Sequence, residues 1–170
     1  NPLDLHDEEF YINQNESIRI YNQLLEGFAT DSATFSADSQ MPYPDYYGGA
    51  YIDDETGQLV VLVTDSDVAI ENAISMYARE VQGICYELCD VSYKDMLTAI
   101  SEITNRIEEF SNQGIDITCV ADNIMNGTVL VGVKDLTNEK KDFILNATNY
   151  DFLVFEENEG VIANAGIGGG

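Results

Sequence analysis

The feature that most restricts the fold of this chain is a pair of apolar segments that flank a tight polar turn. Residues 47–52 and 59–63 have the pattern of two strands, and the turn 53–57 between them ends in Gly57. Glycine supplies the positive φ that such a hairpin turn needs. Residues 59–63 are apolar at every position, so we expect this strand to lie at the centre of a sheet that is covered on both faces.

The same pattern returns in the second half of the chain. Residues 120–135 hold a second turn and a second apolar run, and each copy is followed by a helical pattern and then by a closing strand, at 83–89 and at 150–155. The matching positions are Gly57 and Gly127, Val61 and Val131, Val63 and Val133, and Asp65 and Asp135. The sequence therefore predicts an α+β fold of two strand–strand–helix–strand units with antiparallel hairpins. A chance likeness of two ordinary hairpins is the alternative.

Helical periodicity accounts for the other segments. A first helix is predicted from Asn15 to about Gly27, after an aperiodic acidic arm, and residues 70–81 read as the helix of the first unit. Ser92 and Asp95 have the spacing of a capping box that opens a long connecting helix. The predicted organisation is an N-terminal arm, helix and linker (1–44), the first unit (45–91), the connecting helix (92–114), the second unit (115–157) and a flexible C-terminal tail (158–170).

Each predicted helix has an apolar stripe that we expect to pack in the core. The first stripe is Ile18, Tyr21, Leu24, Leu25 and Phe28, and the stripe of the connecting helix is Met96, Ile100, Ile103, Ile107 and Phe110. In the second unit, Thr137 is expected to cap a helix that directs Phe143, Ile144 and Ala147 inward.

The charge of the chain restricts its partners. It has 31 acidic and 7 basic residues, a net charge of −24, and 45% hydrophobic residues, which is ordinary for a folded domain. Such a surface disfavours nucleic acid and anionic lipid, and it favours basic partners or cations. No apolar run approaches the roughly 20 residues that span a bilayer. Solubility in an extracellular or salty setting explains the same charge without any partner.

Residues for catalysis, cofactor binding or metal binding are not indicated. The only histidine, His6, lies in the predicted arm, and no glycine-rich phosphate loop joins a strand to a helix. The turn 53–57 could bind calcium weakly, but it lacks the ligand spacing of an EF-hand, and a solvated turn explains it. Cys85 and Cys89 are too far apart in an extended strand to form a disulfide with each other. Cys119 could pair with one of them only if the two repeats bring those strands together, and otherwise buried free thiols are expected.

The first hairpin resembles a block in the pro-regions of bacterial chymotrypsin-like serine peptidases of the alpha-lytic protease and streptogrisin type. The residues that carry this resemblance are Gly48, Gly49, Ala50, Tyr51, Asp53 and Gly57, followed by the run 59–65. The similarity extends over residues 43–157. The chain departs from the family pattern in its glycine-rich tail and in its three cysteines, and no protease domain lies within these residues.

The resemblance implies a domain that is not itself an enzyme. It implies an intramolecular chaperone for the folding of an exported chymotrypsin-like serine peptidase, which also inhibits the folded peptidase. A C-terminal three-stranded sheet is implied to pack on the peptidase, and the tail to approach its active-site cleft. The implied docking residues are Val129, Val131, Val133, Phe152, Val154, Val161, Ile162 and Ala163. A secreted or cell-surface location follows, with any leader already removed.

Two other functions fit the residues. A free-standing, secreted acidic binding or adhesion module is consistent with the net charge and with the missing catalytic set. An enzyme that uses carboxylates is the third hypothesis, and it requires a pocket that holds two convergent acids.

Overall fold

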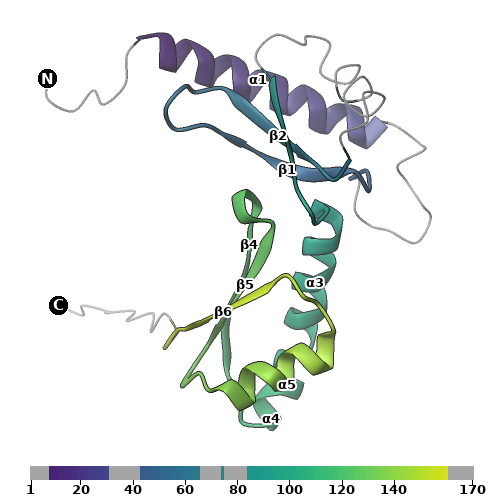
Figure 1. The fold of residues 1–170 in the computed structure, drawn as a ribbon, viewed down its shortest axis with the longest axis vertical. Coiled ribbons are helices and arrows are strands. Elements are labelled where there is room, and N and C mark those ends of the chain that lie inside the picture. Colours follow the sequence, from purple (N-terminus) through teal and green to yellow (C-terminus); the bar gives the residue numbers. More distant parts are fainter. Residues whose placement is uncertain (1–7, 31–42, 66–73, 75–83, 161–170) are drawn as a thin grey trace, which may run out of the picture. The chain divides into compact units, whose positions relative to one another are not determined.

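The computed structural model describes residues 8–30, 43–65, 74 and 84–160, and it has an α+β fold (Figure 1). The chain divides into two compact units. The first comprises Asn1–Met96 with Ile124–Gly127, and the second comprises Leu97–Asn123 with Thr128–Gly170. Each unit has one three-stranded sheet.

The sheet of the first unit is built around its central strand. β1 (Tyr47–Ile52) pairs antiparallel with β2 (Leu59–Val63), and β2 pairs parallel with β3 (Ile84–Leu88). All five residues of β2 are buried, which confirms the prediction of a strand covered on both faces. An unbroken apolar run suits this position, because side chains that alternate across a strand meet a dry environment on either side.

The sheet of the second unit has the same topology. β4 (Ile117–Asn123) pairs antiparallel with β5 (Thr128–Val133), and β5 pairs parallel with β6 (Leu153–Glu157). A single 3₁₀ turn, η1 (Ile124–Asn126), joins β4 to β5. Gly57 and Gly127 are the last residues of the two hairpin turns, and their φ angles of 71° and 60° are positive, as predicted.

The two sheets also share their register, which makes the repeat a structural one. Tyr47 faces Val63 in β1–β2 as Ile117 faces Val133 in β4–β5, and both ladders shift by one residue directly after that pair. The backbone bonds beyond the strands repeat as well. Cys89 N–H donates to Val63 O at 2.9 Å, and Asn158 N–H donates to Val133 O at 3.1 Å. A chance likeness of two hairpins does not explain a shared register, bulge and third strand.

Helix α1 (Glu8–Thr30) begins well before the predicted start at Asn15, so the prediction of an arm that reaches Gln14 is wrong. Glu8 and Glu9 lie in its first turn, where the partial positive charge of a helix N-terminus stabilises acidic side chains. Phe10 is 7% exposed and anchors this turn. The acidic residues Glu8 and Glu9, which suggested an arm, therefore belong to the first turn of the helix.

The buried face of α1 differs in part from the predicted stripe. Ile20, Leu24 and Phe28 are buried in the core with β2, whereas Ile18 is 46% exposed. Polar residues hold the N-terminal half of the helix to the hairpin turn. Buried Ser17 Oγ donates to Gly57 O at 2.8 Å, and Asn13 Nδ2 donates to Thr56 O at 2.9 Å. A serine on the buried face is tolerated because its hydroxyl is paired.

The connecting helix is broken, which corrects the prediction of one helix over 92–114. It consists of α3 (Tyr93–Asn105) and α4 (Ile107–Asn112), with Arg106 between them. The guanidinium of Arg106 bonds Glu102, Glu109 and the carbonyl of Ala147, and it lies 5.1 Å from the ring centroid of Phe110. The start is as predicted, since Ser92 Oγ accepts from Asp95 N–H at 3.1 Å.

The buried faces of α3 and α4 also differ from the predicted stripe. Met96, Ala99 and Ile103 are buried with Phe110, and Ile107 at the start of α4 is 36% exposed. The break at Arg106 rotates the residues after it relative to a continuous helix, so a stripe extrapolated through it misplaces Ile107.

Helix α5 (Asn138–Thr148) and strand β6 complete the second unit. Thr137 caps α5 as predicted, by accepting from Lys140 N–H at 3.3 Å. Ile144 is buried, but Phe143 is 40% exposed, so the prediction that Phe143 points inward is wrong. β6 begins and ends later than predicted, because Glu156 and Glu157 continue the parallel ladder with β5.

The helix predicted at 70–81 falls outside the described residues except for Ile74, which is helical and fully buried in the first core. Among the residues that the structure describes, none of the helices combines the length and the apolar character that a bilayer span requires.

The repeat allows a matched test of how α1 is held. Gly127→Ala should destabilise the fold by about 1–2 kcal/mol, which is the cost of a non-glycine residue in the left-handed conformation. No steric cost is added, since the new Cβ would meet no atom within 4 Å. Gly57→Ala should lower the free energy of unfolding further, because its Cβ would lie 2.6 Å from Phe10 O in α1. Urea unfolding of Gly57→Ala and Gly127→Ala measures the difference. Equal destabilisation by the two variants would contradict the packing of α1 on the turn.

Candidate functional site

The three predicted docking valines of β5 do not lie on a surface, whereas the predicted Val154 of β6 is 46% exposed. Val129, Val131 and Val133 are fully buried in the core of the second unit. Their side chains are therefore not available to a partner, and the prediction that they form a contact surface is corrected. The sequence could not separate the two faces of β5, because alternate positions on both faces are apolar or small.

The opposite face of this sheet is the candidate site. The ladder places Ala121, Leu130 and Val154 in one cross-strand row, on the face opposite to Val129 and Val131. Ala121 is exposed, Leu130 is half-buried and Val154 is 46% exposed. The next row contains Cys119, Gly132 and Glu156. We call these two rows the open face.

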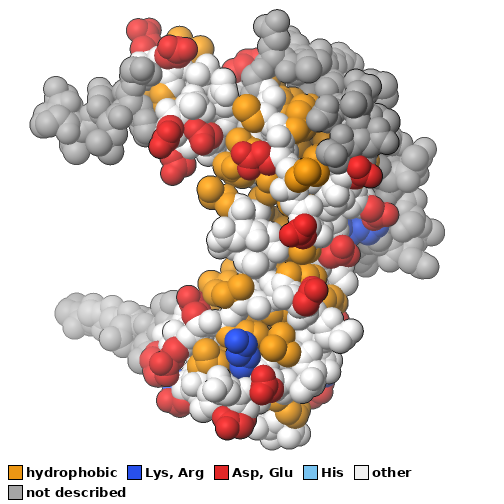
Figure 2. Space-filling view, viewed as in Figure 1, with side chains coloured by type: hydrophobic (Ala, Val, Ile, Leu, Met, Phe, Trp, Pro, Cys, Tyr) orange, Lys and Arg blue, Asp and Glu red, His pale blue; other side chains and the backbone are white. Residues whose placement is uncertain are grey.

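The first unit shows what distinguishes the open face. Val60 and Leu62 occupy the positions of Leu130 and Gly132 in the repeat, and they are only 4% and 3% exposed. In the second unit α3, α4 and α5 gather on one side of the sheet (Figure 1). On the central strands the difference lies at one position, because Leu130 is half-buried where Val60 is buried, whereas Leu62 and Gly132 are both buried. Figure 2 shows surface hydrophobic side chains interspersed with acidic ones.

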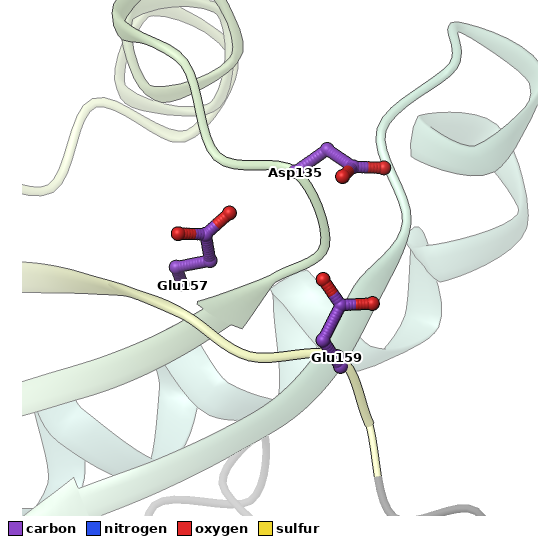
Figure 3. Close-up of side chains that lie close together, drawn as sticks. All are labelled: Asp135, Glu157 and Glu159. Carbon is purple, nitrogen blue, oxygen red and sulfur yellow. The ribbon is translucent and has the colours of Figure 1, made fainter.

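Three carboxylates gather at one end of this sheet. Asp135 follows β5, Glu157 ends β6 and Glu159 lies just beyond, and an oxygen of each lies within 4.8 Å of the others (Figure 3). All three are exposed. Carboxylate oxygens are ligands that calcium prefers, but a calcium ion takes six to eight ligands. Sequence reasoning missed this cluster. Parallel pairing of β5 with β6 brings the C-terminal ends of both strands to one edge of the sheet.

The residues of the resemblance block have structural roles. Gly49 has a φ of 112° in the bulge of β1, and a Cβ on Gly48 would lie 2.2 Å from Cys89 Sγ, so glycine is required at both positions. Ala50 packs against the core, and Tyr51 Oη donates to Glu87 Oε2 at 3.3 Å.

The turn 53–57 is organised by its own carboxylate. Asp53 Oδ1 accepts from Thr56 N–H and Thr56 Oγ1–H, both at 2.7 Å, and from Glu55 N–H at 3.1 Å. The bonds from Thr56 lower the pKa of Asp53 below its ordinary value. One oxygen of the residue considered for calcium is therefore already committed to the turn.

This arrangement predicts a pH effect. Folding lowers the pKa of Asp53, so its bonds stabilise the turn fully above the unfolded-state pKa of about 4, and that stabilisation is lost as the pH falls through the lower folded-state pKa. Asp53→Ala should lower the urea midpoint at pH 7, and the difference from the unaltered chain should shrink in acid. Asp54→Ala, an exposed neighbour, is the control. A difference that persists unchanged at acid pH would refute this role of the carboxylate.

The remaining candidates for chemistry are weak. All three cysteines are free, but Cys85 is exposed and Cys89 and Cys119 are half-buried, so the prediction of buried thiols is wrong. Burial raises the pKa of Cys89, which disfavours the nucleophilic thiolate. A pocket of about 240 Å³ lies between α1 and the first turn, lined by Glu9, Phe10, Asn13, Glu55, Thr56 and Gln58.

Several predicted residues cannot be placed. His6, Val161, Ile162 and Ala163 lie outside the described residues. Phe152, just before β6, is half-buried, and the centroid of its ring lies 5.2 Å from that of Tyr150.

Comparison with known families bears on the first unit. Residues 6–82 match the family model described as Pro-like N-terminal domain. The matched segment includes α1, β1 and β2, and so contains the block of glycines and the turn. No curated protein matches the chain significantly. The N-terminal part of the chain is therefore similar to a propeptide-like domain.

Proposed function

We propose that this chain is a non-catalytic propeptide-like domain that binds an exported chymotrypsin-like serine peptidase, assists its folding and inhibits the folded enzyme. The match of residues 6–82 to the Pro-like N-terminal domain carries the proposal. The peptidase class comes from the resemblance of residues 47–65 to pro-regions of the alpha-lytic protease type. The open face of the second unit supports a docking role.

The open face has the chemistry of a protein contact. Leu130 and Val154 are paired in neighbouring strands. Burial of their apolar side chains against a partner would contribute a favourable free energy of binding. A flat sheet face positions both side chains before binding, so little conformational entropy is lost on docking. The implied contact thus moves from the buried valines of β5 to Leu130 on the other face of that strand, and it keeps the predicted Val154 of β6.

The edge of the sheet offers a second mode of contact. β6 lies at an edge of the order β4-β5-β6, so among the described strands one side of its backbone has no partner. An edge strand can add to the sheet of another protein through main-chain hydrogen bonds. A domain that binds the folding transition state more tightly than the unfolded peptidase would lower its folding barrier.

Substitutions on the open face test the proposal. Leu130→Asn and Val154→Asn should each weaken inhibition of a bacterial chymotrypsin-like peptidase roughly ten-fold, through lost apolar burial, and should lower the yield of refolded peptidase. Ile12→Asn is the control, because Ile12 is 62% exposed on α1 of the first unit. Inhibition constants and refolding yields are measured with all three variants.

The outcomes separate the parts of the proposal. Loss of inhibition in Ile12→Asn alone would move the contact to the first unit. No inhibition and no folding assistance by the unaltered chain, across a panel of such peptidases, would refute the function.

The second candidate function is a secreted acidic binding module. The cluster of Asp135, Glu157 and Glu159 favours it, because three close carboxylates strengthen the local negative potential in a chain of net charge −24. This function predicts binding to basic proteins that weakens steeply with salt. Peptidase inhibition that persists at high salt would count against it.

A further inference from the structure

The tip of the second hairpin differs chemically from its counterpart in the first. Asn126 ends η1 and is followed by Gly127, and this is the one Asn-Gly pair in the sequence. Asn126 is exposed. The first hairpin has Thr56 before Gly57, and its threonine is bonded through both N–H and Oγ1 to Asp53. Of the two turns, the second places a side-chain amide directly before its glycine.

The space around Gly127 is open. A Cβ at this position would meet no atom within 4 Å, and the φ of Gly127 is 60°. Its N–H donates to Ile124 O at 3.1 Å, a bond that closes the single turn of η1. Short 3₁₀ turns have poorer hydrogen-bond geometry than α-helices. Glycine thus adds no side chain beside its own backbone nitrogen, and the space that a Cβ would fill is empty.

We infer that Asn126 is a site of spontaneous deamidation. The backbone nitrogen of Gly127 loses its proton to solvent base and attacks Cγ of Asn126, which forms an N–Cγ bond. The Cγ–Nδ2 bond breaks and ammonia leaves, which produces a cyclic succinimide. Water then adds at Cγ or at the backbone carbonyl carbon, and the ring opens to aspartate or isoaspartate at position 126. Water is the only reactant taken up, and no atom is oxidised or reduced.

Other asparagines lack this combination. Asn123 precedes Ile124, whose branched side chain hinders approach of the nitrogen. Asn158 precedes Glu159, and its Nδ2 donates to Cys119 Sγ at 3.7 Å. Asn146 lies within α5, where regular helical bonds hold the backbone. Within the described residues, the exposed β4–β5 turn is therefore the favoured position for the reaction.

The product would change the hairpin that carries the open face. Either product adds one negative charge to a turn that has none at this position. Isoaspartate also inserts a side-chain methylene into the backbone between β4 and β5, which lengthens a connection whose register is set by turn geometry. Thr128 pairs with Asn123 directly beside the turn and would be the first ladder pair to be disturbed.

Incubation of the whole chain at mildly alkaline pH tests the inference. Peptide mapping by mass spectrometry should find the exchange of NH₂ for OH at Asn126 roughly ten-fold faster than at Asn123 or Asn158, because glycine lacks a hindering Cβ. An isoaspartyl-specific methylation assay should detect the isoaspartate product. Asn126→Gln should remove the rapid phase.

A further variant separates the effect of the glycine on the deamidation rate from the effect of the solvent exposure of Asn126. Gly127→Ala keeps Asn126 in the turn but adds a methyl beside the attacking nitrogen, so it should slow the reaction strongly. Circular dichroism establishes that this variant is folded before its rate is compared. Deamidation of Asn126 no faster than that of Asn123 and Asn158 would overturn the inference, and so would an unchanged rate in folded Gly127→Ala.

Discussion

Each half of this fold depends on burial of one central strand. β2 and β5 each pair antiparallel with the preceding strand and parallel with the following one, so their backbone groups are bonded on both edges. The core-facing residues Val61 and Val131 are fully buried. A parallel neighbour requires a long crossover, which a helix supplies. α5 is that crossover in the second unit, and its buried Ile144 belongs to the same core.

The repeated topology gives the differences between the units their meaning. The two sheets have matching strands, registers and bulges, yet Val60 is 4% exposed whereas its counterpart Leu130 is half-buried. Gly132 in place of a larger residue leaves room for Cys119, whose Sγ would lie 2.5 Å from a Cβ there. The same motif thus carries a larger side chain at Leu62 in the first unit and a glycine at Gly132 in the second.

Charge and shape act together in the proposed function. The net charge of −24 opposes association of the chain with itself through the open face, because like charges repel. Three acidic residues, Asp135, Glu157 and Glu159, gather at one end of the second sheet, where Glu157 ends the edge strand β6.

Local features of the structure were predictable from the sequence, whereas the choice between faces was not. The hairpins, the positive φ of Gly57 and Gly127, and the cap at Thr137 were predicted, because each follows from a few adjacent residues. Tertiary packing decided the start of α1, where buried Phe10 draws an acidic segment into the helix, and the break at Arg106. Packing also decided that Val131 faces the core and Leu130 does not. Alternation places neighbouring residues on opposite faces, but only the docked helices determine which face is removed from water.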